Sequence, residues 1–87
     1  MSKIQFTELG WEDYLYWQFR DKKILKRINN LLKSIERDGA GDGLGQPEKL
    51  KYLNDEFSRR INDSDRLVYM VTDGVIIVIS CRGHYEK

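Results

Sequence analysis

The chain has 87 residues, which is enough for one compact domain spanning residues 1–87 and excludes a second. Its 15 basic and 14 acidic residues give a net charge of +1, which excludes attraction to nucleic acid or membranes through total charge alone. A single cysteine, Cys81, excludes an intramolecular disulfide, and the longest apolar run, residues 75–79, is too short to cross a bilayer. Together with the lack of a secretory signal, these features predict a cytoplasmic protein with no membrane partner.

The N-terminal segment predicts a strand followed by a helix. Polar and apolar side chains alternate over residues 3–7, and Thr7 can cap a helix that begins at residue 8. That helix extends to about residue 18, with apolar residues at helical spacing: Trp11, Tyr14, Leu15 and Trp17. We interpret these aromatic residues as core and interface side chains rather than as a platform that stacks bases.

A second helix follows after a short break. Asp21 is a suitable N-cap, and apolar residues recur at i, i+4, i+7, i+8 and i+11: Ile24, Ile28, Leu31, Leu32 and Ile35. So short a break predicts an antiparallel helical hairpin. The stretch RDGAGDGLGQPEKL then ends the helix and predicts an exposed loop, which lacks the lysine and hydroxyl spacing of a nucleotide-binding P-loop.

The C-terminal half predicts three antiparallel strands joined by turns at residues 62–65 and 73–74. In the first two strands the side chains alternate, so that one face carries Phe57, Arg59, Ile61, Leu67, Tyr69 and Val71, and the other carries Ser58, Arg60, Asn62, Arg66, Val68 and Met70. The last strand, GVIIVISCR, is apolar on both faces, which predicts a strand covered on both sides. The predicted fold class is α+β, a two-helix hairpin packed on an antiparallel sheet in the order β-α-α-β-β-β.

Several polar residues can converge at one end of this sheet. The only histidine, His84, directly follows the most hydrophobic strand, while Arg60 and Arg66 flank the turn at residues 62–65. Glu48 closes the glycine-rich loop. Lys51 lies three residues after Glu48, and Tyr85 directly follows His84. Together these six residues suit cleavage of a phosphodiester, because they include a base, an acid and cations for the developing charge.

Five segments resemble the YoeB family of bacterial toxins in the RelE superfamily: WEDYLYWQ, INNLLKSI, GQPEKLK, SRRINDSDRLVY and CRGHY. The resemblance covers nearly the whole chain and implies a RelE-like fold. It also implies a ribosome-dependent endoribonuclease that cleaves mRNA in the decoding site and is inhibited by a cognate, YefM-like antitoxin. The resemblance implies no metal or other cofactor and leaves a homodimer open.

The resemblance also implies a role for each of the six residues. Glu48 matches the general base that takes the 2′-hydroxyl proton, and His84 matches the acid that protonates the leaving 5′-oxygen. Arg66 matches the arginine that stabilises the phosphorane. The remaining three match residues that bind the substrate: Lys51, Arg60 and Tyr85.

Two alternatives to a nuclease stay open. Toxins of the same fold include gyrase poisons, which bind a protein target and cleave no RNA. An inert interaction domain is the second alternative, and it would cause no growth arrest.

The line Lys26, Asn30, Lys33 and Arg37 on the second helix is either an ordinary solvated face or a contact to ribosomal RNA phosphates. Cys81 is interpreted as a small buried residue of the last strand, because no cluster of metal ligands accompanies it.

Overall fold

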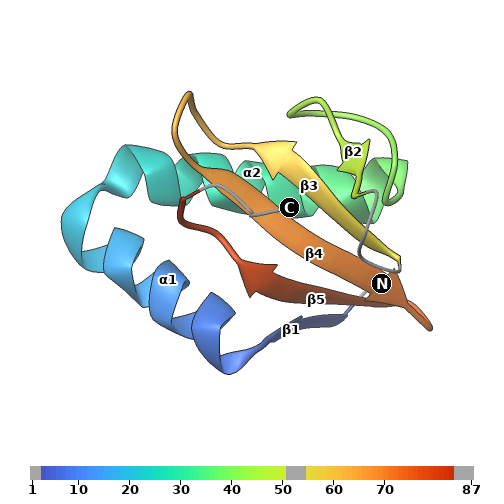
Figure 1. Cartoon of the computed structure of the whole chain (residues 1–87), viewed down its shortest axis with the longest axis horizontal. Helices are drawn as coiled ribbons and strands as arrows, with labels where there is room; N and C mark the ends of the chain where they lie inside the picture. Colours follow the sequence, from blue (N-terminus) through green and yellow to red (C-terminus); the bar gives the residue numbers. More distant parts are fainter. Residues whose placement is uncertain (1–2, 51–54, 84–87) are drawn as a thin grey trace.

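The computed structural model describes residues 3–50 and 55–83. In these ranges the chain forms two helices and five strands (Figure 1). In chain order these are β1 (Lys3–Phe6), α1 (Glu8–Arg20), α2 (Lys22–Asp38), β2 (Glu48–Lys49), β3 (Glu56–Arg60), β4 (Arg66–Thr72) and β5 (Val75–Ser80). The strands form one sheet in the order β1-β5-β4-β3-β2. The predicted α+β architecture is confirmed.

Both predicted helix caps are confirmed. The Thr7 hydroxyl accepts a hydrogen bond from the Gly10 backbone N–H at 3.0 Å, and the Asp21 carboxylate accepts from the N–H groups of Lys23 and Ile24. Asp21 alone separates α1 from α2. The helices therefore turn back on each other, as predicted, and splay apart away from this turn (Figure 1).

The sheet differs from the prediction at both edges. Strands β3, β4 and β5 form the predicted antiparallel meander, but β1 pairs in parallel with β5, which makes the sheet mixed. Strand β2 was not predicted, and it pairs antiparallel with β3. Two residues inside a glycine- and proline-rich stretch are too few to show an alternating pattern, so this strand left no signal in the sequence.

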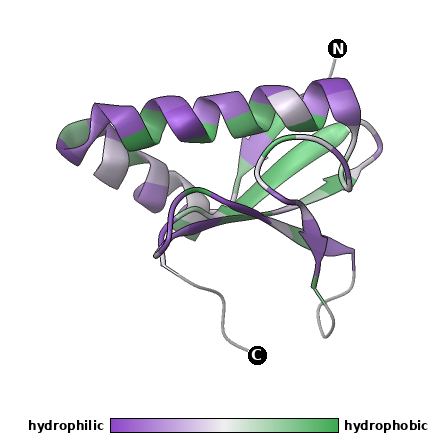
Figure 2. Cartoon of the chain, turned by 90° about the horizontal axis from the view of Figure 1, so that it is seen from above, coloured by the Kyte–Doolittle hydropathy of each residue, from purple (hydrophilic) through white to green (hydrophobic). Residues whose placement is uncertain are grey.

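The helices cover one face of the sheet, and hydrophilic residues line the outer side of α2 (Figure 2). Between the two layers lies one hydrophobic core, in which helix residues meet side chains from β4 and β5: Trp17, Ile28, Leu31, Leu32, Ile35, Leu67, Tyr69, Ile76 and Val78. The predicted alternation is confirmed, since Ile61, Leu67 and Tyr69 belong to this core and Phe57 and Val71 pack against it, whereas Val68 and Met70 do not. The opposite face is called the open face below.

The prediction that β5 is covered on both sides is wrong for the described residues. Ile76 and Val78 are buried beneath the helices, whereas Val75 and Ile77 are only partly buried. No helix of residues 3–50 and 55–83 packs on the open face (Figure 2). A continuous apolar run cannot distinguish full from partial cover, because half-buried strand positions also accept valine and isoleucine.

Strand β5 contains a β-bulge. Val68 pairs with Ser80 and Tyr69 pairs with Val78, so Ile79 is an extra residue.

The start of α1 packs tightly on β5. A Cβ atom at Gly10 would lie 2.3 Å from the Val78 carbonyl oxygen. Glycine is therefore needed at position 10 because the helix backbone approaches the strand backbone too closely for a side chain.

Neither helix in the described ranges combines the length and the apolar character that a membrane span requires.

Candidate active site on the open face

Two of the predicted site residues meet across three strands. Glu48 of β2 is paired with Ser58 of β3, and Arg60 of β3 is paired with Arg66 of β4. Paired residues share a face, so all four side chains belong to the open face. The Arg66 Nη2 atom lies 3.6 Å from Glu48 Oε1. The structure thus brings the predicted base and the predicted phosphorane-stabilising arginine into one ion pair.

This ion pair combines a sheltered cation with an accessible anion. The Arg66 side chain is 18% exposed, whereas that of Glu48 is 57% exposed. A distance of 3.6 Å is longer than a charge-assisted hydrogen bond of about 2.7–2.9 Å. The carboxylate is therefore accessible to another donor, whereas the guanidinium is largely shielded from solvent.

Ser58 is a site residue that the sequence analysis missed. Its side chain is fully buried, and its hydroxyl accepts a hydrogen bond of 3.0 Å from Arg66 Nε. The alternating pattern placed Ser58 on the correct face but could not show which side chain it contacts. That information requires the register of β3 against β4.

Arg60 lies opposite Arg66 in the register, as predicted, but its guanidinium is engaged elsewhere. It forms an ion pair with the exposed carboxylate of Asp63 in the turn at residues 62–65. Its backbone N–H donates to the Gly45 carbonyl at 2.7 Å, and its carbonyl accepts from Arg27 Nη2 at 3.0 Å. The side chain is half-exposed, so a ligand can compete with Asp63 for it.

Lys51, His84 and Tyr85 lie outside the described residues, and their predicted roles stay predictions. The residue before His84 is described. The Gly83 N–H donates to Asp65 Oδ1 at 2.7 Å, and the Gly83 carbonyl accepts from the Arg66 N–H at 3.0 Å. Two hydrogen bonds therefore connect Gly83 to residues 65 and 66.

Cys81, two residues before Gly83, is hydrogen-bonded to α1. The Cys81 N–H donates to Asp13 Oδ2 at 3.0 Å, and the Cys81 carbonyl accepts from Trp17 Nε1 at 2.7 Å. Cys81 is fully buried, and burial raises the pKa of its thiol to about 12. This burial confirms the interpretation of Cys81 as a small buried residue, but β5 ends at Ser80, so Cys81 lies just after the last strand and not in it.

The aromatic residues of α1 divide as the sequence suggested. Trp17 is buried in the core. Trp11 is half-exposed and packs edge-on against Phe6 and stacked on Tyr14. Their helical spacing therefore reflects packing on β1 and β5 rather than a separate ligand site.

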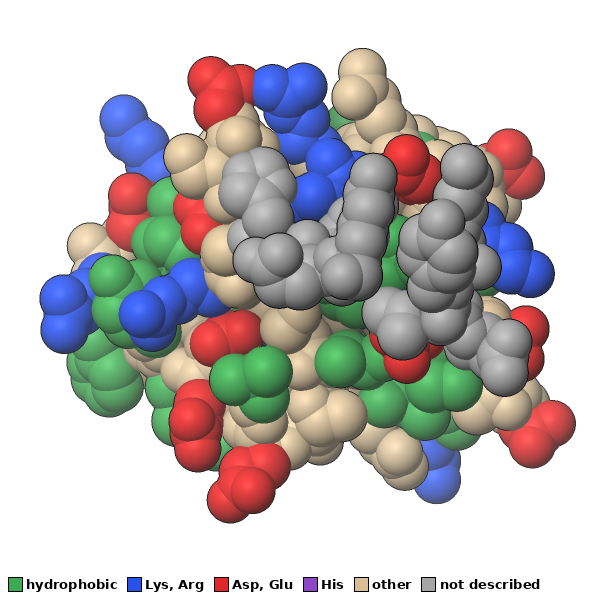
Figure 3. Space-filling model, viewed as in Figure 1, with side chains coloured by type: hydrophobic (Ala, Val, Ile, Leu, Met, Phe, Trp, Pro, Cys, Tyr) green, Lys and Arg blue, Asp and Glu red, His purple; other side chains and the backbone are tan. Residues whose placement is uncertain are grey.

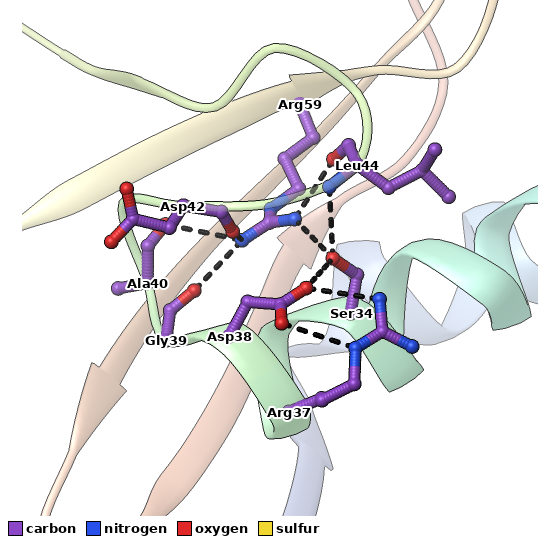
Figure 4. Close-up of polar contacts among 8 residues, drawn as sticks. All are labelled: Ser34, Arg37, Asp38, Gly39, Ala40, Asp42, Leu44 and Arg59. Atoms are coloured by element: carbon purple, nitrogen blue, oxygen red, sulfur yellow. Dashed lines mark hydrogen bonds and ion pairs between the residues drawn. The ribbon is translucent and has the colours of Figure 1, made fainter.

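A second missed residue, Arg59, organises the glycine-rich loop (Figure 4). Its fully buried guanidinium donates to the carbonyls of Gly39, Asp42 and Leu44 at 2.6–2.8 Å. It also donates to the hydroxyls of Ser34 and Tyr69. All of these acceptors are uncharged, so the charge is stabilised by dipoles. Arg59 therefore holds the segment that leads into β2 and Glu48.

Ser34 and Asp38 close the same loop from α2 (Figure 4). The Ser34 hydroxyl accepts from the Leu44 N–H and donates to Asp38 Oδ2, both at 2.9 Å. Arg37 contacts the same carboxylate through two nitrogens, at 2.9 and 3.1 Å. Hydrogen bonds from Arg37 and Ser34 lower the pKa of Asp38.

The predicted polar line on α2 is exposed along its length: Lys26, Asn30, Lys33 and Arg37. Exposure fits both interpretations of this line.

On the open face, hydrophobic side chains lie beside basic and acidic groups (Figure 3). Within residues 3–50 and 55–83, no group of three or more His, Cys, Asp or Glu side chains is placed to hold a metal ion.

Comparisons with known proteins converge on one family. A family model described as a YoeB-like toxin of bacterial type II toxin–antitoxin systems matches residues 6–85. The chain is 56% identical to the toxin YoeB of Synechocystis sp. over 86 residues, covering 98% of this chain and 99% of the relative. Two solved structures from Staphylococcus aureus are also similar. A chain of the YoeB–YefM complex has 51% identity and a TM-score of 0.91, covering 98% of this chain and 99% of that chain. A chain of the YoeB dimer has 52% identity and a TM-score of 0.92, with coverages of 97% and 98%.

Proposed function

Because the chain belongs to the YoeB-like toxins of bacterial type II toxin–antitoxin systems, we propose that it is an endoribonuclease that cleaves mRNA in the decoding site of the ribosome and so inhibits translation. Its membership confirms the resemblance inferred from the sequence. The observation that carries the proposal is the Glu48–Arg66 pair on the open face, with a distance of 3.6 Å between the charged atoms.

Glu48 acts as the general base in this mechanism. Its exposed carboxylate takes the proton from a ribose 2′-hydroxyl, and the 2′-oxygen attacks the adjacent phosphorus. The bond from the 2′-oxygen to phosphorus forms while the bond from phosphorus to the 5′-oxygen breaks. His84 gives a proton to the departing 5′-oxygen. The products are a 2′,3′-cyclic phosphate on the upstream fragment and a 5′-hydroxyl on the downstream fragment.

Arg66 stabilises the negative charge that develops on the phosphorane oxygens. A largely buried guanidinium is effective because fixed donors in a region sheltered from water need no reorganisation during the reaction. When substrate binds, its phosphate replaces Glu48 as the partner of Arg66, which frees the carboxylate to act as a base. Lys51 and Arg60 add phosphate contacts, and Tyr85 orients the substrate near the leaving group.

The ribosome is part of the active enzyme in this proposal. A chain with a net charge of +1 holds RNA weakly, and ordering a flexible strand for in-line attack has a large entropic cost. A codon held in the decoding site removes much of that cost. The exposed line Lys26, Asn30, Lys33 and Arg37 docks on ribosomal RNA phosphates.

A YefM-like antitoxin inhibits the toxin in the resting cell. The support is the YoeB–YefM complex of the S. aureus relative. An acidic segment that folds on binding would cover Arg60 and Arg66 by charge complementarity. The YoeB dimer of S. aureus supports self-association of this chain as well.

Cleavage of one mRNA, naked or bound to ribosomes, tests the reaction and its setting. We expect rapid cleavage on ribosomes, slow cleavage of naked RNA and a 2′,3′-cyclic phosphate product. A 2′-methoxy group at the cut site should block the reaction, because the attacking oxygen then has no proton to lose. Equal rates for naked and bound RNA would contradict the ribosome dependence, and cleavage of the 2′-methoxy substrate would contradict the mechanism.

Expression in cells separates this function from the gyrase alternative. A ribonuclease should deplete intact mRNA and stop translation before any damage to DNA. DNA breaks that appear while mRNA is still intact would instead support action on gyrase.

A further inference from the structure

We propose that Ser58 is a positioning residue that sets the orientation of the Arg66 guanidinium for phosphodiester cleavage. The inference rests on the proposed function, because it assigns Ser58 a part in the same reaction. Ser58 itself touches no reacting atom. It acts through one hydrogen bond, from Arg66 Nε to the Ser58 hydroxyl at 3.0 Å.

The register explains why a small residue is required at position 58. Ser58 is paired with Glu48 on one side and with Val68 on the other, while Arg66 is paired with Arg60. Arg66 is therefore a diagonal neighbour of Ser58, and its side chain must pass along the strand to approach Glu48. A long side chain at position 58 would occupy the space between Arg66 and Glu48.

The Ser58 hydroxyl also restricts the orientation of the Arg66 guanidinium. A guanidinium has five N–H donors in one plane, so a hydrogen bond at Nε restricts the rotation of that plane, and a charged partner near Nη2 restricts it further. Ser58 provides the first contact and Glu48 provides the second. When substrate phosphate displaces Glu48, the contact at Nε remains. Ser58 therefore keeps the remaining donors directed at the phosphate during the reaction.

Burial indicates that this contact is persistent. The Ser58 side chain is fully buried, and Arg66 is largely buried, so water competes poorly for the hydrogen bond. By comparison, the Arg60 guanidinium on the same face forms an ion pair with the exposed carboxylate of Asp63, within the turn at residues 62–65. Of the two arginines, Arg66 is the one with a fixed orientation.

Two substitutions separate the acceptor from the volume of the side chain. Ser58→Cys keeps nearly the same shape but replaces the hydroxyl by a weak acceptor, whereas Ser58→Thr keeps the hydroxyl and adds a methyl group. We expect Ser58→Cys to lower kcat on ribosome-bound mRNA by about 10- to 100-fold, because a small misplacement of a catalytic group has effects of this size. KM should change by less than about twofold, since the charge of Arg66 is unchanged. Ser58→Thr should retain most of the activity.

A measurement that does not depend on the reaction accompanies the kinetics. The ¹⁵N–¹H NMR signal of Arg66 Nε–H, assigned by its loss in Arg66→Lys, reports the hydrogen bond to Ser58. Exchange of this proton with water should speed up about tenfold in Ser58→Cys, the effect of losing one ordinary hydrogen bond. Arg59 Nε–H, which donates to the Tyr69 hydroxyl at 2.8 Å, is the internal control and should not change.

The kcat values and the exchange rates together decide whether Ser58 positions Arg66. Faster exchange at Arg66 together with lower kcat supports the proposal. Unchanged exchange in Ser58→Cys would overturn it, and so would faster exchange with a wild-type kcat. If the wild-type protein cleaves no ribosome-bound mRNA, the proposed function is contradicted, and so is a role of Ser58 in that reaction. The exchange measurement would then still show whether Ser58 holds the Arg66 guanidinium.

Discussion

Asp65 and Gly83, which are 18 positions apart, are connected by a 2.7 Å hydrogen bond from the glycine N–H to the carboxylate. The Gly83 carbonyl in turn accepts from the Arg66 N–H at 3.0 Å. The chain therefore leaves β5 at a fixed point beside the arginine of the candidate site. His84, the predicted acid, is the next residue in the sequence and lies outside the described residues.

Replacing Asp65 by alanine should weaken catalysis more than stability. The variant loses the acceptor for Gly83, and we expect mRNA cleavage to fall at least tenfold because the predicted acid is held less firmly. Asp65→Asn keeps an acceptor oxygen and should remain close to wild type. The measurement is single-turnover cleavage of ribosome-bound mRNA, with thermal unfolding as the control for folding. Equal activity of Asp65→Ala and wild type would show that the contact with Gly83 has no part in positioning.

Replacing Arg59 by methionine should destabilise the fold strongly. The substitution leaves the carbonyls of Gly39, Asp42 and Leu44 without their donor. A buried acceptor left without a donor typically costs about 1–3 kcal/mol, so the loss of all three donors should lower the free energy of unfolding by more than about 3 kcal/mol. The neighbouring Arg60 is half-exposed, so Arg60→Met should change the free energy of unfolding by less than about 1 kcal/mol. Urea unfolding compares the two variants, and similar losses for both would contradict the role given to Arg59.

The Cys81 thiol should make the protein less stable in alkali. Burial raises its pKa to about 12 in the folded chain, whereas an exposed thiol ionises near pH 8.5. This raised pKa contributes stability that is fully present below about pH 8.5 and is lost as the pH rises toward 12. Burial also raises the pKa of Tyr69, but an exposed phenol ionises only near pH 10.

Urea unfolding between about pH 8 and 9 therefore isolates the cysteine, because an exposed phenol is still almost fully protonated there. The free energy of unfolding should fall with pH in the wild type, with a slope that approaches about 1.4 kcal/mol per pH unit. In Cys81→Ala the slope should be smaller, whatever the absolute stability of this variant. Identical slopes would contradict the assignment.

Local features of the fold were predictable from the sequence, because they depend on neighbouring residues. Thr7 and Asp21 cap their helices through bonds to residues two or three positions away. The tight turn at residues 62–65 fixes Arg60 opposite Arg66. Alternation then assigned the faces of β3 and β4 correctly.

Features that depend on distant segments were not predictable. The parallel pairing of β1 with β5 joins residues 72 positions apart. Arg59 occupies an apolar position, and its burial becomes favourable only when the glycine-rich loop folds over it and supplies carbonyl oxygens. The Ser58–Arg66 contact needs the register of the sheet. Lys51, His84 and Tyr85 remain predictions based on the family resemblance.

Cleavage of ribosome-bound mRNA by the Glu48→Gln variant tests most directly whether Glu48 and Arg66 form the centre of a ribonuclease. The amide has nearly the same shape as the carboxylate but accepts no proton, so the loss of rate reports general base catalysis. We expect a folded protein whose single-turnover cleavage is about 10²- to 10⁴-fold slower than wild type, while its binding to ribosomes is unchanged. A Glu48→Gln protein that cleaves at the wild-type rate would contradict the proposed site.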